Sequence, residues 1–349
     1  MKSFFIGIDF SKEKFDATVI RTSAEGEARE HGEFKNKTDG YKAFLRWVIR
    51  KSEGLPTSSW LFCGENTGIY GENLAVWLSS KGFDVWIENA LAIKRSMGLV
   101  RGKSDKIDSM RIAEYAKEKQ DKACLYAPLS HNLKTLKMLL SRRQDIVSVR
   151  TSVQNAINEM KRVLSDIPDA IERLNGRLLA IADELKALEN EITALMHTTA
   201  STDESLKENY SIVVSMKGIS TINAVAMLVY TNNFNNFQTA KRMMSFWGVA
   251  PFGEYSGTSV HKAPHVSHYA NRWLKGLLTQ AARCAIKWNT PIRAYFNRLV
   301  ERGKNFPVAL NNVKAKMINI IFHMVRNKTF FNENFNSNIN KRMIATAMC

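Results

Sequence analysis

Residues 4–16 have the sequence FFIGIDFSKEKFD, an apolar run of strand length, a polar break and a second apolar start. This pattern predicts a β-hairpin in which the carboxylate of Asp9 lies at the end of a buried strand. A carboxylate there is costly to desolvate unless a cation or hydrogen bonds compensate it. Two interpretations remain open: a strand-end aspartate with satisfied hydrogen bonds, or one ligand of a divalent metal site.

Three later carboxylates fall at positions that can converge on Asp9. Glu65 follows a short apolar run that reads as a buried strand, so it is also a strand-end carboxylate. Asp105 and Asp108 lie three residues apart, on one face of the first turn of a helix for which Ser104 or Asp105 is the expected N-cap. Acids at a helix N-terminus also complement the helix dipole, so this pair has a purely structural interpretation as well.

The first 120 or so residues alternate strand and helix signals. After the hairpin we expect a weak strand over residues 30–34, a helix over 38–48, a strand over 60–63, a helix over 70–81 and a strand over 83–87. Three antiparallel strands followed by strand–helix–strand–helix predict a mixed α/β sheet. Functional sites in such sheets gather at the strand ends.

Apolar residues then repeat at alternating spacings of three and four from Ile146 to Ile167 and, after Pro168, from Ile171 to Leu195. Two heptad seams with a break between them predict an antiparallel helical hairpin that projects as a coiled coil. Packing against the rest of the chain, a nucleic-acid surface and subunit association remain open as its role, and we favour dimerisation. With a polar linker at residues 198–204, the predicted domains are residues 1–127, 128–200 and 201–349.

The chain is strongly basic, with 50 Lys and Arg against 33 Asp and Glu and a net charge of +17. From Lys241 to the end there are 17 Lys and Arg and three acidic residues, so most of the excess lies there. This charge favours a nucleic-acid partner. Four scattered cysteines fit a reducing cytoplasm, and no apolar segment is long enough to span a membrane, so a cytoplasmic, nucleoid-associated protein is expected.

The third predicted domain is mainly helical and carries two local motifs. The segment around Gly218 resembles the glycine hairpin of helix-hairpin-helix modules, whose backbone N–H groups can meet a phosphate. Ser256 precedes a glycine and is therefore sterically exposed, as a nucleophile must be, although most Ser-Gly pairs are turns. Candidate nucleic-acid contacts, with solvated helix faces as the alternative, are Lys103, Lys217, Gly218, Lys262, Arg272, Lys275, Arg283, Lys287, Arg293 and Arg298.

The order of the motifs resembles that of a known family. The motifs are Gly7-Ile8-Asp9, Glu65-Asn66-Thr67-Gly68, Lys103-Ser104-Asp105-Lys106-Ile107-Asp108, Gly218-Ile219-Ser220 and Ser256-Gly257-Thr258-Ser259. Together they resemble the DEDD transposases of the insertion-sequence one-ten family, which includes the pilin-gene invertases. The resemblance covers nearly the whole chain, and the joint order is far more specific than any single motif.

The resemblance implies an RNase H-like (RuvC-type) first domain whose quartet Asp9, Glu65, Asp105 and Asp108 holds one or two Mg²⁺, a coiled-coil insertion, and a last domain with Ser256 as its conserved serine. It also implies a structured non-coding bridge RNA that pairs with donor and target double-stranded DNA. The family's recombinases assemble as tetramers in the synaptic complex, and protomers complete each other's active site.

These implications give a mechanistic hypothesis. Ser256 attacks a DNA phosphorus and forms a transient phosphoserine link, while the four carboxylates hold Mg²⁺. The alternative enzyme is a Mg²⁺-dependent endonuclease of the Holliday-junction type, in which water is the nucleophile. A basic architectural protein that has lost its catalytic function is the non-enzymatic alternative.

Overall fold

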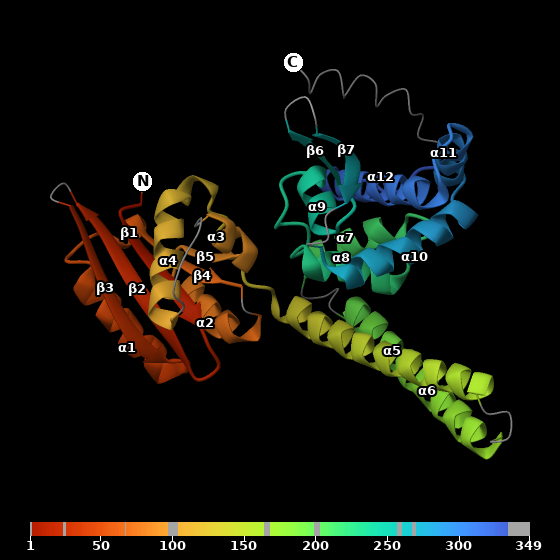
Figure 1. Ribbon diagram of the computed structural model, residues 1–349, viewed down its shortest axis with the longest axis horizontal. Helices are drawn as coiled ribbons and strands as arrows, with labels where there is room; N and C mark the ends of the chain where they lie inside the picture. Colours follow the sequence, from red (N-terminus) through yellow and green to blue (C-terminus); the bar gives the residue numbers. More distant parts are fainter. Residues whose placement is uncertain are drawn as a thin grey trace. The chain divides into compact units, whose positions relative to one another are not determined.

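The structure, a computed structural model, describes residues 2–23, 26–66, 68–96, 104–163, 168–198, 203–256, 260–266 and 270–333. The chain divides into two compact units, residues 1–128 and 129–349, which are drawn in red to yellow and in yellow to blue (Figure 1). The division at residues 127 and 200 into three domains stays a prediction.

The first unit is built on a five-stranded mixed sheet with the order β3-β2-β1-β4-β5. β1 pairs with β2 and β2 with β3 in antiparallel fashion, and β1, β4 and β5 are parallel. The strands are β1 (Phe4–Phe10), β2 (Lys14–Ser23), β3 (Gly26–Lys35), β4 (Trp60–Glu65) and β5 (Val85–Glu88). The predicted mixed α/β sheet is thereby confirmed, with a third strand longer than expected.

Helices cover both faces of this sheet because its central strands alternate buried side chains between two cores. Phe4, Ile6 and Ile8 of β1 pack with Phe44 of the first helix, whereas Phe5 packs with residues of the last. The helices are α1 (Thr38–Lys51) and α2 (Ile69–Ser80) on one face, and α3 (Ala90–Ser96) and α4 (Asp105–Glu118) on the other. Two short 3₁₀ helices span Thr57–Ser59 and Gln120–Lys122.

Two helix starts test the capping predictions. Ser104 is the N-cap of α4, and its hydroxyl accepts a hydrogen bond from the backbone N–H of Ile107. For the helix over residues 38–48, Thr38-Asp39 indicated a capped start. This prediction is wrong, because α1 includes both residues and its N-cap, Lys37, forms no side-chain cap hydrogen bond.

Gly7 sets the distance between β1 and α4. A Cβ atom at this position would lie 2.2 Å from both the backbone nitrogen of Ala113 and the carbonyl oxygen of Ser109. Beside it, the hydroxyls of Thr18 and Ser109 are hydrogen-bonded at 2.8 Å in a fully buried position. Only glycine lets the backbone of α4 lie this close to the strand, and this approach brings the first turn of α4 to the carboxyl end of β1.

We expect Gly7→Ala to lower the free energy of unfolding by about 3 kcal/mol, because the added methyl group meets backbone atoms that cannot rotate away. Urea denaturation measures this loss. Gly176→Ala is the matched control, since a Cβ there contacts nothing within 4 Å in the middle of a helix, and alanine should stabilise it by about 0.5–1 kcal/mol. Equal effects of the two substitutions would contradict the close-approach argument.

The second unit begins with two long helices, α5 (His131–Val163) and α6 (Pro168–Thr198), which pack against each other as the predicted hairpin (Figure 1). Ile146, Val153 and Ile157 of α5 are buried, but Val149 is 43% exposed and Val163 is 71% exposed, so the predicted seam on α5 is only partly correct. Arg143 forms an ion pair with Glu189 at 2.7 Å across the two helices.

The rest of this unit is a helical body with one small sheet. Its largest core includes residues of both long helices and of the helices that follow them. These helices are α7 (Glu204–Val214), α8 (Thr221–Tyr230), α9 (Ala240–Phe246), α10 (Arg272–Trp288), α11 (Thr290–Glu301) and α12 (Phe306–Arg326). The mainly helical character expected of this region is confirmed, and among the described helices of both units none is long and apolar enough to cross a membrane.

The small sheet was not expected. Strands β6 (Pro251–Ser256) and β7 (Val260–Val266) pair in antiparallel register, with an irregularity between Phe252 and Glu254. The sequence indicated a loop over residues 248–253, because its proline and glycines are turn residues. In the structure, strand β6 instead begins at Pro251 and ends at Ser256.

Candidate active site

The acidic residues of the first unit gather on the face of the sheet that α4 covers. Successive side chains of a strand point to opposite faces, and Phe5 and Gly7 of β1 both face α4. Asp9 therefore faces α4 as well. The same alternation applies to β4, in which Leu61 and Cys63 belong to the α4 core and Glu65 ends the strand.

Two further acids on this face were missed by the sequence analysis. Asp16 lies opposite Asp9 in the register of the hairpin and is only 5% exposed. Glu88 lies opposite Glu65 in the parallel pair of β4 and β5, and its carboxylate accepts a hydrogen bond from the hydroxyl of Tyr115 at 3.2 Å. The hairpin register, together with the period of two, was the signal that could have identified Asp16.

The first turn of α4 supplies Asp105 and Asp108 at the same edge. Lys14 of β2 has Glu33 of β3 as its nearest acid, at 2.6 Å, and its ammonium also lies 3.9 Å from the carboxylates of Asp105 on α4 and of Asp16 on its own strand. Asp108 accepts a hydrogen bond from Arg111 at 2.8 Å. The structural interpretation of this pair therefore has support of its own, since both acids lie at a helix N-terminus and each has a cationic neighbour.

Burial and the charges of neighbouring acids both act on Asp9. Burial raises its pKa from 3.8 to about 6, and the charges of Asp108, Asp105, Glu65 and Asp16 add to this shift. All four predicted carboxylates thus interact electrostatically within one unit. The raised pKa shows that the charged form of this carboxylate is destabilised in the folded protein. A bound cation would stabilise that charged form.

The donor set fits a hard divalent cation, because these ligands are carboxylate oxygens, which suit Mg²⁺ better than zinc. As arranged, no three His, Cys, Asp or Glu side chains in the part of the chain that the structure describes surround a common point that an ion could occupy. The ligand type and the negative charge of the cluster therefore fit Mg²⁺. The described side chains, however, are not arranged so that three of them could coordinate one ion.

The backbone of Ser256 lies at the tip of a β-hairpin in the second unit. It ends β6 and is paired in register with Val260, the first residue of β7. The residues between them lie outside the described part of the chain, as does Lys103. Lys262 is on β7, opposite Glu254.

The structure shows the surroundings of Gly218 and of two of the predicted basic contacts, Lys217 and Arg293. Gly218 has a φ of +106° between α7 and α8, and a Cβ there would lie 2.6 Å from Ala285, so this turn requires glycine. Lys217 forms an ion pair with Glu333 at 2.7 Å. Arg293 donates hydrogen bonds to the carbonyl oxygens of Ile286 and Lys287, so it caps the end of α10 and its guanidinium is already engaged.

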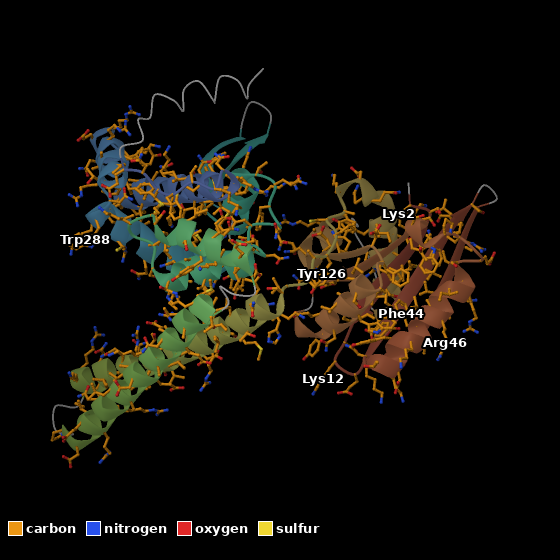
Figure 2. The ribbon with its side chains drawn as sticks, turned by 180° about the vertical axis from the view of Figure 1, so that it is seen from behind. Lys2, Lys12, Phe44, Arg46, Tyr126 and Trp288 are labelled. Atoms are coloured by element: carbon orange, nitrogen blue, oxygen red, sulfur yellow. The ribbon has the colours of Figure 1, made fainter. Side chains whose placement is uncertain are left out.

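Other basic residues of the second unit remain available to a ligand. Arg272, Arg283 and Lys287 are exposed on α10, and Arg298 is exposed on α11. Lys287 lies over the ring of Trp288, which is 61% exposed and points away from the body of the unit (Figure 2). An exposed tryptophan among cations is typical of surfaces that stack nucleic-acid bases. The sequence analysis missed this residue, although the Lys-Trp pair was a visible signal.

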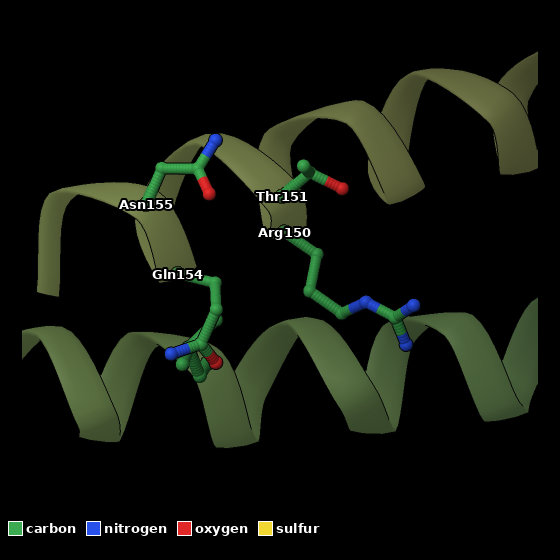
Figure 3. Close-up of a pocket in the computed structure, with 5 residues that line it drawn as sticks. Arg150, Thr151, Gln154 and Asn155 are labelled. Atoms are coloured by element: carbon green, nitrogen blue, oxygen red, sulfur yellow. The ribbon is translucent and has the colours of Figure 1, made fainter. Parts of the chain in front are cut away.

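A cavity of about 430 Å³ lies along the helical hairpin, between α5 and α6 (Figure 3). It is lined by Arg150, Thr151, Gln154, Asn155 and Leu178. None of these is an acid, so the cavity offers no carboxylate ligand for a metal ion.

Comparisons with known proteins agree with this arrangement. Residues 6–167 match a family model described as a transposase, and residues 210–297 match one described as "Transposase IS116/IS110/IS902 family". The pilin gene-inverting proteins of Moraxella bovis and Moraxella lacunata are each 27% identical over 342 residues, which cover 95% of this chain and 99% of theirs. An uncharacterized 43.6 kDa protein of insertion element IS110 from Streptomyces coelicolor is 28% identical over 188 residues, 49% of this chain and 44% of its own length.

The two matched segments contain Asp9, Glu65 and the acids of α4 on one side and Ser256 on the other. The chain belongs to the IS116/IS110/IS902 family of transposases, and it is a DNA transposase that cleaves and rejoins DNA strands.

Proposed function

We propose that this transposase exchanges strands between donor and target DNA through a covalent phosphoserine intermediate at Ser256, with Mg²⁺ held by Asp9, Glu65, Asp105 and Asp108. The proposal of a magnesium site rests on the position of Asp9. This residue faces the first turn of α4, and its pKa is raised by burial and by the other acids of the proposed site. The mixed five-stranded sheet, with its acids on one face, supports an RNase H-like (RuvC-type) assignment of this unit.

The covalent step conserves a phosphate ester. The Ser256 oxygen forms a bond to a backbone phosphorus, the bond from that phosphorus to a deoxyribose oxygen breaks, and the proton of the serine passes to the departing oxygen. Attack by a deoxyribose hydroxyl of the other DNA reverses these changes and releases the serine. Neither step needs an outside energy source, because one phosphodiester-type bond replaces another.

Mg²⁺ bound to the carboxylates would neutralise the phosphate and lower the pKa of the attacking or departing hydroxyl. The protein's own part is to hold the acids together against their mutual repulsion. Gly7 permits the close approach of α4, and Lys14 bridges Asp16 and Asp105. The first contact sets the spacing between β1 and α4, which carry three of the four acids, and the second links β2 to α4.

The basic second unit supports a role in binding nucleic-acid backbones. Its exposed cations include Arg272, Arg283, Lys287 and Arg298, and phosphate contacts of this kind position a nucleic acid without reading its sequence. We propose that base pairing with a structured non-coding guide RNA supplies the choice of donor and target, and that a tetramer forms in the synaptic complex. Sequencing the RNA that co-purifies with the protein tests the guide.

The alternative is a Mg²⁺-dependent endonuclease of the Holliday-junction type, in which water attacks and the second unit only binds DNA. The acidic cluster favours it as much as it favours strand exchange, since both reactions use metal-bound carboxylates. The position of Ser256 at the tip of a β-hairpin, within a segment that matches a transposase model, favours the serine route.

One gel distinguishes the two. The protein, purified with the RNA that it retains, is incubated with Mg²⁺ and end-labelled DNA that carries the gene for this chain with its flanking sequence. The reaction is stopped with denaturant and half is treated with protease. We expect a labelled protein–DNA adduct that disappears on proteolysis and does not form in the presence of EDTA. Cleaved ends that are free of protein at every time point would establish hydrolysis instead.

A further inference from the structure

The apolar stripe of α12 contains one lysine. Leu310, Val313, Met317 and Ile318 are buried in the core of the second unit, and Lys314 lies among them with only 6% of its surface exposed. An ammonium group that leaves water needs a counter-ion or a full set of hydrogen bonds. Lys314 has neither: among the described residues its one hydrogen-bond partner is the hydroxyl of Thr279 on α10, at 3.4 Å.

A second cation lies beside it. Lys275 precedes Thr279 by one turn of α10, and the hydroxyl of Thr279 donates to the carbonyl oxygen of Lys275 at 2.7 Å. Burial and the charge of Lys275 lower the pKa of Lys314 to about 8. Within the described ranges, neither lysine forms an ion pair with an acidic residue, so the repulsion between their charges is not compensated by an acid.

The two lysines adjoin the turn that leads into the strand of Ser256. Gly248 lies against Lys275, since a Cβ at Gly248 would be 3.7 Å from the Cδ atom of that lysine. Asn311, one turn before Lys314 on α12, donates a hydrogen bond from its side chain to the carbonyl oxygen of Val249 at 2.9 Å. Strand β6 then begins at Pro251.

We propose that Lys314 and Lys275 form a binding site for one phosphodiester group of a nucleic-acid backbone, next to the turn at Gly248–Val249 that leads into strand β6. A phosphate supplies the negative counter-charge that is missing beside both lysines, and its oxygens accept hydrogen bonds from both ammonium groups. A buried cation costs stability in the free protein and repays this cost only when the anion is bound. This proposal requires that the enzyme acts on DNA, but it does not depend on the proposed roles of Ser256 or of Mg²⁺.

Substitution of Lys314 by methionine has effects of opposite sign on folding and on binding. Methionine keeps the unbranched apolar stem and removes the charge, so we expect Lys314→Met to raise the melting temperature of the full-length protein. The same variant should bind nucleic acid more weakly, by roughly tenfold, and the slope of log K against log salt concentration should fall by about 0.9, the loss of one phosphate contact. Binding is measured without Mg²⁺ to a mixed-sequence DNA duplex and to an RNA hairpin, and the probe that responds identifies the source of the phosphate.

Lys275→Met and the double variant test whether the lysines share one phosphate. If they do, the double variant loses no more salt dependence than either single variant, whereas independent contacts would lose about twice as much. Lys304→Met, on an exposed position before α12, is the control and should leave the melting temperature unchanged. Unchanged affinity of Lys314→Met for both probes, or a lower melting temperature, would overturn the proposal. Should Lys314→Met fail to fold, the salt slope of Lys275→Met decides it, because an unchanged slope excludes the site.

The assay is independent of the proposed strand-exchange chemistry. A protein that forms no adduct can still bind phosphate at these lysines, and a protein that forms the adduct can lack this site. A negative result for the phosphate site therefore does not contradict the strand-exchange proposal, and a negative result for strand exchange does not contradict the phosphate site.

Discussion

Ser256→Ala is expected to abolish strand exchange, with a loss of at least about 10⁴-fold, because removal of a covalent nucleophile leaves only the binding and metal contributions to the rate. The labelled protein–DNA adduct should disappear together with the recombinant product. The affinity for DNA should stay within about twofold of wild type, since a hydroxyl group contributes little to a backbone contact that depends on charge. Recombinant DNA and adduct are measured on the same denaturing gel, and affinity by a filter or gel-shift assay without Mg²⁺.

Ser259→Ala is the matched control, because it removes the same atom from the same short segment. It should retain both product and adduct. If Ser256→Ala still forms the adduct, another residue is the nucleophile. If neither protein forms an adduct and both release free ends, water is the nucleophile and the hydrolytic alternative holds.

The sequence predicted the first unit well because its signals are local and repeated. The two apolar runs at Phe4 and Phe15 predicted the hairpin, and Ser104 marked the beginning of α4 correctly. The mixed sheet followed from the succession of elements, whereas the order of its strands was not predicted. The placement of Asp9 on the α4 face needed one more fact, the approach of α4 to Gly7, which no local pattern contains.

The second unit was harder to predict for two physical reasons. The pairing of β6 with β7 is irregular between Phe252 and Glu254, so it lacks the alternation that identifies a strand. The burial of Lys314 depends on α10, which is distant in sequence. A signal was nevertheless present, because Lys314 occupies a position inside the apolar stripe of its helix, where a charged residue is rare.

The two charge clusters follow one rule with opposite signs. Burial and neighbouring acids raise the pKa of Asp9 in the first unit, and burial and a neighbouring lysine lower the pKa of Lys314 in the second. Either arrangement reduces the stability of the free protein and is compensated by an ion of opposite charge. Sequence patterns identify the individual residues, but the absence of compensation is visible only in the fold.

Asp9→Asn is expected to make the metal-free protein more stable and the enzyme inactive. The pKa of Asp9 is about 6 in the folded chain and near 3.8 in the unfolded one, so the folded state binds this proton more tightly. As pH rises from about 4 to about 6, the free energy of unfolding therefore falls, by about 1 kcal/mol after allowance for solvent screening of this partly exposed carboxylate, and then stays constant. Asparagine carries no charge, so the free energy of unfolding of the variant does not fall in this way as the pH rises.

Urea denaturation in EDTA measures the prediction. At pH 8 the variant should exceed wild type by about 1 kcal/mol, because solvent screens the charge of a partly exposed carboxylate, and the difference should shrink towards zero near pH 4, where Asp9 of the folded wild type is protonated. Mg²⁺ should stabilise the wild type at pH 8 and have a smaller effect on the variant, because one ligand is lost. Strand exchange should fall at least about 100-fold. Asp121→Asn, at an exposed position outside the acidic face, should change none of these quantities.

The same experiment separates the two interpretations of Asp9. A strand-end aspartate that is satisfied by hydrogen bonds loses stability when its charge is removed, because a charged acceptor forms the stronger bond. A variant less stable than wild type at pH 8 would therefore contradict the metal-site interpretation. Burial and the charges of the neighbouring acids raise the pKa of Asp9, so repulsion in the free protein and attraction for a cation are both expected at this position. The gain in stability and the loss of activity would then arise from the same missing charge.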